Sequence, residues 1–459
     1  MGKAEGGVLG LIGRTPVIKL ERFDTGLCEL YLKLENQNPG GSIKDRIGLS
    51  MVAAAEQDGR LGSHQSRLVE ATAGNTGLGL ALVAAQRGYQ LTLVMPDKMS
   101  REKVLHLKAL GAQVVVTRSD VEKGHPDYYQ ELAERIARDD GAFYVNQFCN
   151  PANPLAHETT TGPEIAEQFE GRLDAMVCGV GSGGTLTGLS RYFARRMPCC
   201  EMVLADPEGS VLAEYVTTGR VGKVGSWLVE GIGEDFVPPI ADLSRVRRAY
   251  VIPDRESLET ARLLLRRAGV LAGSSTGTLV AAALRYCREQ SVPKRVCTLV
   301  CDSGNKYLSK MFNDFWMADQ ALIDRPMTGD LRDVVTRRYA DRAMVTVRPV
   351  DTLLVAYGRM KLHDVSQLPV MEDDRVVGIV DESDLLLAAM ADAPRLRSLV
   401  SDVMTTKLKT VRIGTPLRDL MPLFEAGFVP IVMDGDAFVG LLTRMDLLSY
   451  LRQRIDPTR

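Results

Sequence analysis

The sequence predicts an α/β fold with parallel sheets, followed by a second, smaller unit. Short apolar runs alternate with helical patterns over roughly the first 315 residues. Several of these runs lead into Gly-rich turns that open helices, as in β-α-β units whose sheets are covered by helices. The last third of the chain contains two similar segments, which indicate an internal repeat.

The expected strands are short apolar runs, many of them rich in β-branched residues. In chain order they are 30–34, 67–70, 90–95, 113–117, 175–178, 202–205, 249–252 and 296–301. Apolar residues at helical spacing predict a helix that begins near Lys44, one over 78–86 and one over 101–110. Ligands of parallel sheets bind at the carboxyl ends of the strands, which is where the turns at Gly74 and Gly181 lie.

Composition and charge exclude several classes of protein. The chain has 459 residues, which suggests two or three domains, and its 45% hydrophobic and 25% charged residues are ordinary for a globular protein. A formal net charge of −2 gives no general attraction to nucleic acid or anionic membranes. No apolar run is long enough to span a bilayer, and the N-terminus lacks a signal pattern. We therefore expect a cytoplasmic protein that binds neither nucleic acid nor membrane.

The eight cysteines and five histidines do not form a disulfide or metal-binding pattern. There is no Cys-x-x-Cys pair, and Cys178, Cys297 and Cys301 lie in apolar runs, where cysteine behaves as a small buried hydrophobe. No histidine has metal-ligand spacing with a cysteine. These features predict a reducing compartment and no structural metal.

The turn Pro39-Gly-Gly-Ser-Ile-Lys-Asp-Arg46 places Lys44 at or near the start of a helix. A lysine after two glycines is more often a solvated surface group. If the amine is partly buried, its pKa is lowered and it can form a Schiff base with a carbonyl. The turn alone does not decide between these two interpretations.

A second Gly-rich turn, 179–184, follows the strand expected at 175–178. Small residues let consecutive backbone N–H groups converge and a helix N-terminus adds its dipole, so a phosphate suits this turn. The turn also matches the Gly-x-Gly-x-x-Gly dinucleotide fingerprint, with Asp206 at the end of the next strand. Against a nicotinamide site, the turn lies in mid-domain, and such a site leaves the Lys44 and Asn75 segments unexplained.

Four segments together resemble the fold-type II pyridoxal-phosphate enzymes, namely 39–46, 72–77, 181–185 and 269–277. Two more, 146–154 and 160–165, fit the cysteine synthase and cystathionine β-synthase branch of that family. The resemblance covers residues from about 8 to 317. It implies a tryptophan-synthase-beta-like catalytic domain with pyridoxal 5′-phosphate as its cofactor.

The resemblance implies a role for each matching residue. Lys44 matches the Schiff-base lysine, which then serves as general base and acid. Asn75 matches the residue that bonds the 3′ oxygen of the cofactor, and Ser275 the serine that faces its pyridine nitrogen. The phosphate loop corresponds to Gly181, Ser182, Gly183, Gly184 and Thr185, and the substrate carboxylate site to Thr72, Ala73, Asn75, Thr76 and Gln147. Alternatively, Thr72 and Thr76 cap the helix that follows.

The resemblance also implies an activity, in which L-homocysteine replaces the hydroxyl of L-serine to give L-cystathionine and water, with hydrogen sulfide formed from cysteine. Glu234 and Asp235 stand where cysteine synthases usually carry small residues. These acids favour a second substrate with an ammonium group, or else belong to a solvated loop. Ala73 replaces a serine common at its position, which leaves substrate preference open. The alternatives are cysteine synthesis from O-acetylserine and sulfide, serine or threonine dehydration, and a ligand-sensing scaffold with a vestigial enzyme domain.

The C-terminal repeat resembles a tandem CBS-domain (Bateman) module over roughly 327–455. Segments 378–386 and 440–448 are similar, and each unit is expected to run strand, helix, strand, turn, strand, helix. One unit is too small to bury a good core, so the two should pack as a pair. The expected domain limits are 1–317 for the catalytic domain, 318–340 for a linker, 341–395 for CBS domain 1 and 396–459 for CBS domain 2.

Such pairs often sense adenosyl ligands. Asp446 is placed to bond ribose hydroxyls and Thr443 to cap a helix or touch the ligand, whereas Asp381 replaces the hydroxyl residue in the first repeat. A carboxylate repels a phosphate but tolerates a sulfonium, which favours S-adenosylmethionine over ATP. Alternatively, Asp381 and Asp384 are helix-start residues and the module only sets oligomerisation. In either case a homodimer or homotetramer is expected. The chain starts almost directly at segment 9–16, without the haem segment of animal cystathionine β-synthases, so no haem is expected.

Overall fold

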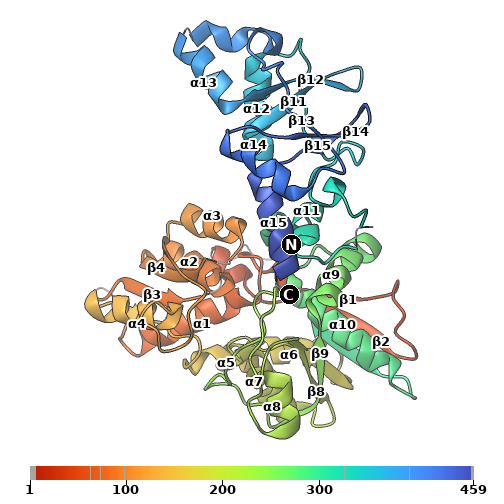
Figure 1. Cartoon of the computed structure of the whole chain (residues 1–459). Coiled ribbons are helices and arrows are strands. Elements are labelled where there is room, and N and C mark those ends of the chain that lie inside the picture. The colour runs from red at the N-terminus through yellow and green to blue at the C-terminus, as the bar shows by residue number, and fades with distance from the viewer. Residues whose placement is uncertain are drawn as a thin grey trace, which may run out of the picture. The chain divides into compact units, whose positions relative to one another are not determined.

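The computed structural model describes residues 7–62, 64–72, 74–97, 99–324, 327–391 and 393–455, and the chain forms two compact units, Met1–Asn313 and Asp314–Arg459 (Figure 1). The first unit is α/β with two sheets, and the second has two small sheets with short helices. The predicted fold class is confirmed. All eight cysteines are free. Across the described ranges, no helix has both the length and the apolar character needed to cross a membrane.

The larger sheet of the first unit is almost entirely parallel. In spatial order its strands are β1 (Val17–Lys19), β2 (Glu29–Lys33), β10 (Arg295–Leu299), β7 (Ala175–Cys178), β8 (Glu201–Pro207) and β9 (Val246–Ile252). Neighbouring strands pair in parallel except β1 with β2. The central strands β7 and β8 are buried along nearly their whole length, as expected where helices cover both faces.

The smaller sheet is parallel throughout. Its strands, in spatial order, are β5 (Gln113–Thr117), β4 (Gln90–Pro96), β3 (Arg67–Ala71) and β6 (Phe143–Tyr144). Every strand that the sequence predicts in the first 315 residues is present in one of the two sheets, with ends displaced by at most three residues. The sequence does not predict β1 and β6, because strands of three and two residues are too short to show a period.

Helices pack around both sheets, and Figure 1 shows α1 to α4 gathered about the smaller sheet in red and orange. The helices of this unit are α1 (Lys44–Gln57), α2 (Asn75–Arg87), α3 (Arg101–Ala109), α4 (Tyr129–Asp139), α5 (Ala152–Ala156), α6 (Gly162–Gln168), α7 (Gly184–Arg196), α8 (Leu212–Thr218), α9 (Asp254–Ala268) and α10 (Ser274–Arg288). Ile43 is buried in the core of the larger sheet and Ile47 in that of the smaller sheet. Lys44 therefore lies where the two cores meet.

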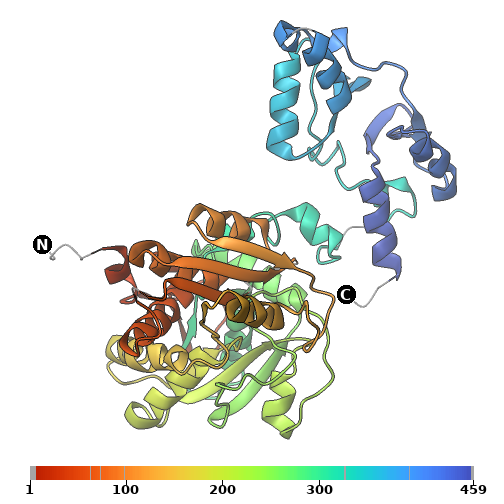
Figure 2. The same cartoon turned by 90° about the vertical axis from the view of Figure 1, so that its left-hand side faces the viewer.

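The second unit begins with α11 (Asp314–Asp319) and contains both repeats, drawn in lighter and darker blue in Figure 2. The first repeat holds α12 (Leu353–His363), β11 (Gln367–Glu372), β12 (Arg375–Asp381) and α13 (Glu382–Ala391), and the second holds β13 (Thr410–Arg412), α14 (Met421–Glu425), β14 (Ile431–Asp434), β15 (Ala437–Leu441) and α15 (Arg444–Ile455). The leading strand expected in the first repeat is reduced to one parallel bridge between Val347 and Val370. Pro349 has no N–H with which to continue that ladder.

Apolar side chains join the two repeats, as the small size of each one predicts. One buried cluster contains Met371 of β11, Ile431 of β14, and Phe438 and Leu441 of β15. The segment 331–335, which the sequence assigns to the linker, also contributes to the core of the second repeat. Neither contact has a periodic signal in the sequence, because the residues involved lie in separate segments.

Candidate active site

The turn that carries Lys44 is fixed beside the carboxyl end of β10. Gly41 has a φ of 74°, in the left-handed region that favours glycine. The Ile43 N–H donates to the Cys301 carbonyl oxygen at 2.9 Å, and Ser42 forms an antiparallel bridge with Asp302. Since α1 begins immediately afterwards, Lys44 lies at the sheet edge where the sequence predicts a ligand.

Protein atoms surround the Lys44 amine, although part of the side chain remains exposed. Burial lowers the pKa of Lys44 below its ordinary value, even though the charges of Asp302 and Glu234 act to raise it. Within the described part of the chain, no hydrogen bond or ion pair engages its Nζ atom. A free amine with a lowered pKa is a nucleophile for a carbonyl carbon.

The second Gly-rich turn connects β7 to α7 and is packed so closely that only glycine fits. A Cβ atom on Gly181 would lie 2.6 Å from a carbonyl oxygen of the neighbouring loop, and one on Gly184 would lie 1.8 Å from Asn153 Oδ1. Gly183 has a φ of 90°, and Ser182 Oγ accepts a hydrogen bond from Asn153 Nδ2 at 2.9 Å. The turn thus presents backbone N–H groups at the start of a 13-residue helix, which suits an anion.

A neutral histidine supports the helix end of this turn. Thr185 Oγ1 lies 3.2 Å from His157 Nε2, and His157 Nδ1 lies 3.0 Å from Thr161 Oγ1. Burial, together with the charges of Lys44 and Arg46, holds the pKa of His157 well below its ordinary value. The ring is therefore uncharged at pH 7, and it fixes the Thr185 hydroxyl at the N-terminus of α7.

Asn75, the first residue of α2, is held by residues that follow β10. Asn75 Nδ2 donates to Asp302 Oδ2 at 2.7 Å, and Lys306 Nζ donates to Asn75 Oδ1 at 3.0 Å. The Tyr307 hydroxyl donates to the same Asp302 oxygen at 2.6 Å, and burial lowers the pKa of Lys306 to about 8.

Sequence reasoning missed the two partners of Asn75, Asp302 and Lys306, and also Tyr307, which bonds to Asp302. One signal was available, because Asp302 lies just beyond β10 at the carboxyl edge of the sheet. No local pattern marks Lys306 or Tyr307.

Thr76 and Gln147 meet as the sequence predicts for a shared carboxylate site. The Thr76 hydroxyl donates to Gln147 Oε1 at 2.7 Å, and Gln147 Nε2 donates to a backbone carbonyl at the end of β3 at 3.1 Å. Thr72 Oγ1 accepts from the Gly74 N–H at 3.0 Å, which stabilises the turn. No side chain caps α2, so neither threonine has the helix-capping role that was the alternative interpretation. Ala73 lies outside the described residues.

Ser275 lies in the first turn of α10 and is buried beside the Cys301 thiol. Burial raises the pKa of Cys301 to about 12, so its thiol is neutral. A Cβ atom on Gly273, the residue before the helix, would lie 1.9 Å from Asp302 Oδ1. The close packing of these segments brings Ser275 to the same sheet edge as Lys44.

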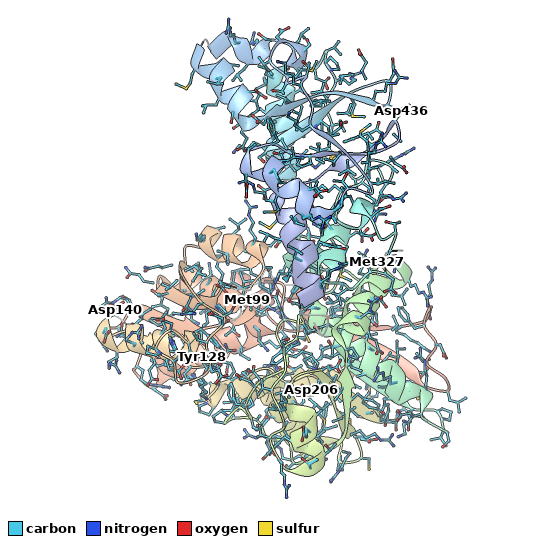
Figure 3. All side chains as sticks on the ribbon, viewed as in Figure 1. Met99, Tyr128, Asp140, Asp206, Met327 and Asp436 are labelled. Carbon is cyan, nitrogen blue, oxygen red and sulfur yellow. The ribbon has the colours of Figure 1, made fainter. Side chains whose placement is uncertain are left out.

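The two acids that the sequence singles out are both half-buried. Glu234 Oε1 lies 3.8 Å from the position that a Cβ atom on Gly181 would occupy, and its charge acts on Lys44. Burial raises the pKa of Tyr128, labelled in Figure 3, and the charge of Asp235 adds to this shift. Both acids are therefore partly shielded from solvent, and their contact with a second substrate stays a prediction.

Asp206, also labelled in Figure 3, has a structural use. Its Oδ2 atom accepts from the Ala213 N–H at 2.8 Å in the first turn of α8. Burial raises the pKa of Asp206 to about 6. A carboxylate engaged in this way gives no support to the nicotinamide interpretation.

In both repeats of the second unit, the residues singled out as ligand contacts make reciprocal bonds at helix starts. Asp381 Oδ1 accepts from the Ser383 N–H at 2.8 Å, and Asp384 Oδ2 accepts from the Asp381 N–H at 3.0 Å. The Thr443 hydroxyl donates to Asp446 Oδ2 at 2.6 Å, and the Asp446 N–H donates to Thr443 Oγ1 at 3.1 Å. These bonds stabilise the starts of α13 and α15, as the helix-start alternative predicts.

Comparison with known families matches both parts of the chain. The family described as pyridoxal-phosphate dependent enzyme matches residues 8–302, and the CBS domain matches residues 331–391 and 400–453. A cystathionine beta-synthase from Dictyostelium discoideum is 35% identical to the chain over 461 residues, which cover 97% of this chain and 92% of that protein.

Two solved structures resemble the first unit. An O-acetylserine dependent cystathionine beta-synthase from Helicobacter pylori is 35% identical, with a TM-score of 0.62, and the match covers 66% of this chain and 97% of that one. A hydrogen sulfide-producing enzyme from Fusobacterium nucleatum is 33% identical, with a TM-score of 0.60, and the match covers 66% of this chain and 99% of that one.

Proposed function

Because the chain belongs to the pyridoxal-phosphate dependent enzymes, and among them to the cystathionine beta-synthase family, we propose that it replaces the hydroxyl group of L-serine with the thiol of L-homocysteine, giving L-cystathionine and water. The observation that carries the proposal is the convergence of three features from both sheets: Lys44 and the turn 181–185 follow strands of the larger sheet, and Asn75 follows β3 of the smaller sheet and bonds to Asp302 beyond β10. The bound cofactor would supply an electron sink for the α-carbon of the amino acid.

The residues present fit pyridoxal phosphate. The turn 181–185 offers backbone N–H groups at a helix start to the phosphate, and the free amine of Lys44 would bind the aldehyde. Asn75 would donate from Nδ2 to the 3′ oxygen of the cofactor, and the Ser275 hydroxyl would face the pyridine nitrogen. A neutral hydroxyl at that nitrogen would leave the ring less electron-withdrawing than a carboxylate partner would, which suits elimination at the β-carbon.

Three further residues, Lys44, Gln147 and Glu234, would act directly on the two substrates. Lys44, with its lowered pKa, would take the proton from the substrate α-carbon and return it after the thiol has added. The Gln147 amide bonds within the protein to the Ala71 carbonyl oxygen and to the Glu70 carboxyl, and it would turn one N–H toward the substrate carboxylate when substrate binds. The half-buried carboxylate of Glu234 would attract the ammonium group of the incoming homocysteine.

A second candidate reaction uses O-acetylserine as the first substrate, with acetate as the leaving group. The similarity to an O-acetylserine dependent relative supports it, and Ala73 stands where a serine is common. Formation of hydrogen sulfide from cysteine is a side activity that the similarity to the Fusobacterium enzyme supports.

Visible absorption separates the two candidates. The purified protein, supplied with pyridoxal phosphate, should be yellow, its band should change when L-serine is added, and L-homocysteine should then yield L-cystathionine. A band that responds to O-acetylserine but not to L-serine would establish the second candidate instead. The absence of any band after addition of pyridoxal phosphate would contradict both, and a Soret band would contradict the expectation that the enzyme contains no haem.

For the second unit, we propose that S-adenosylmethionine binds near Asp446 and Thr443. The acidic pair Asp381 and Asp384 of the first repeat supports a sulfonium over a nucleotide phosphate, because like charges repel. Isothermal calorimetry of the full-length chain should show S-adenosylmethionine binding more tightly than ATP. Tight ATP binding with no heat from S-adenosylmethionine would reject the proposal.

Three further expectations complete the proposed function, namely the domain limits given above, a homodimer or homotetramer, and a cytoplasmic location. Limited proteolysis tests the first, light scattering of the purified chain the second, and cell fractionation the third.

A further inference from the structure

The Lys306 side chain links its own segment, after β10, to the Lys44 turn and to α2 through hydrogen bonds. No function has yet been proposed for it. It lies in the short helix Gly304–Tyr307 and is almost fully buried. Its Nζ atom donates to the Gly40 and Gly41 carbonyl oxygens, at 3.1 Å each, and to Asn75 Oδ1 at 3.0 Å. A lysine ammonium has three N–H bonds, so these acceptors use all of them. The ammonium therefore has one defined position between the Lys44 turn and α2.

This position determines which way the Asn75 amide faces. Its Oδ1 atom accepts from the Lys306 ammonium, and its Nδ2 atom donates to Asp302 Oδ2 at 2.7 Å. A half-turn of the amide would bring Oδ1 against the Asp302 carboxylate and the NH2 group against the ammonium. Both contacts would be repulsive, and burial of Lys306 and Asp302 strengthens the repulsion.

We propose that Lys306 is a positioning residue. It orients Asn75 so that the amide presents an N–H, and not its oxygen, to the 3′ oxygen of the bound cofactor. An NH2 group has two N–H bonds. One donates to Asp302 Oδ2, and the second, which lies against the Tyr307 hydroxyl, would donate to the cofactor oxygen when the cofactor binds. The inference rests on the proposed function, since it requires Asn75 to meet the cofactor.

Lys306 also holds the Gly40–Gly41 turn, so the test must separate orientation of Asn75 from simple loss of stability. Lys306→Met is compared with Lys33→Met, because Lys33 is a second fully buried lysine with three hydrogen bonds. Its Nζ atom donates to Thr15 O at 2.7 Å, Glu164 Oε2 at 2.7 Å and Gln168 Oε1 at 3.0 Å. Both variants should melt at lower temperature as apo-proteins.

Cofactor binding should distinguish them. Titration of each apo-protein with pyridoxal phosphate, followed by visible absorption, should show binding weakened about tenfold or more in Lys306→Met, the loss expected for a hydrogen bond involving a charged group. The ratio of the absorption bands of the bound cofactor should also change. In Lys33→Met, both the affinity and the band ratio should equal those of the wild-type chain. Lys306→Gln replaces Lys306→Met if the latter is insoluble, with the same expected direction.

A double-mutant cycle tests whether Lys306 acts through Asn75. If it does, Asn75→Ala combined with Lys306→Met should bind pyridoxal phosphate no more weakly than Asn75→Ala alone. Fully additive losses, or unchanged affinity and bands in Lys306→Met, would overturn the inference. Failure of the wild-type chain to bind pyridoxal phosphate would instead overturn the proposed function, so the two results are distinct.

Discussion

Lys44→Ala should lower the rate of cystathionine formation by at least about 10³-fold, within the range that a positioned general base contributes. The variant should also lose the covalent link to the cofactor, so that sodium borohydride no longer attaches pyridoxal phosphate to the protein. Thermal stability of the apo-protein should be unchanged or higher, because removal of a desolvated amine relieves a cost of burial. Assays of product formation, peptide mapping after reduction and thermal melting measure the three effects.

Lys108→Ala is the control, since Lys108 is an exposed lysine of α3 and should behave as the wild-type chain. Lys306 is the strongest alternative candidate for the lysine that binds the cofactor, because it is a second amine in the site with a lowered pKa. Peptide mapping that places the reduced cofactor on Lys306, or retention of the covalent link in Lys44→Ala, would refute the role given to Lys44.

Arg46→Met should reduce the free energy of unfolding by about 3–5 kcal/mol, because it leaves a buried carboxylate without its cation. The guanidinium donates from Nε and from one terminal nitrogen to both oxygens of Glu35, at 2.8 Å each, and from the other to Glu164 Oε1 at 2.7 Å. The Glu35 side chain is fully buried. Urea unfolding of the full-length chain at pH 7 measures the loss.

An exposed ion pair supplies the control for Arg46. Arg60 lies 2.8 Å from Asp58, but their side chains are 50% and 61% exposed, so Arg60→Met should cost less than about 1 kcal/mol. If the two arginine variants lose the same stability, the buried cluster around Arg46 does not have the energetic importance assigned to it.

Acid unfolding gives a second readout of the same cluster. Burial alone raises the pKa of Glu164, but the bonds from Arg46 and Lys33 outweigh burial and lower that pKa to about 2. A lowered pKa in the folded state stabilises the protein above the ordinary value of 4.5, and this stabilisation is lost as the pH falls toward 2. Arg46→Met should therefore make unfolding less dependent on pH in this interval.

Much of the site can be read from local patterns. The Gly-rich turns precede helices, because glycine permits the φ of Gly41 and Gly183 and the close packing at Gly184. The strands appear as apolar runs because burial on both faces removes the polar alternation. Knowing that the strands are parallel is then enough to gather the turns at one edge of the sheet.

The partners of those turns could not be read in the same way. Arg46 lies in the first motif that the sequence analysis singles out, yet its pairing with Glu35 and Glu164 depends on α1, the segment before it and α6 packing together. Asp302 and Lys306 lie 227 and 231 residues from Asn75, and no spacing rule connects them to it. The folded chain is required to identify these contacts.

Backbone preferences act over a few neighbouring residues, and they were sufficient to establish the α/β order, the helix start at Lys44 and the Gly-rich turn that opens α7. The lowered pKa of Lys44, the direction of the Asn75 amide and the Arg46 cluster were decided only by the tertiary structure. Each of these depends on the exclusion of water around charged groups from distant segments, which strengthens electrostatic interactions and exists only after the sheets and helices have packed.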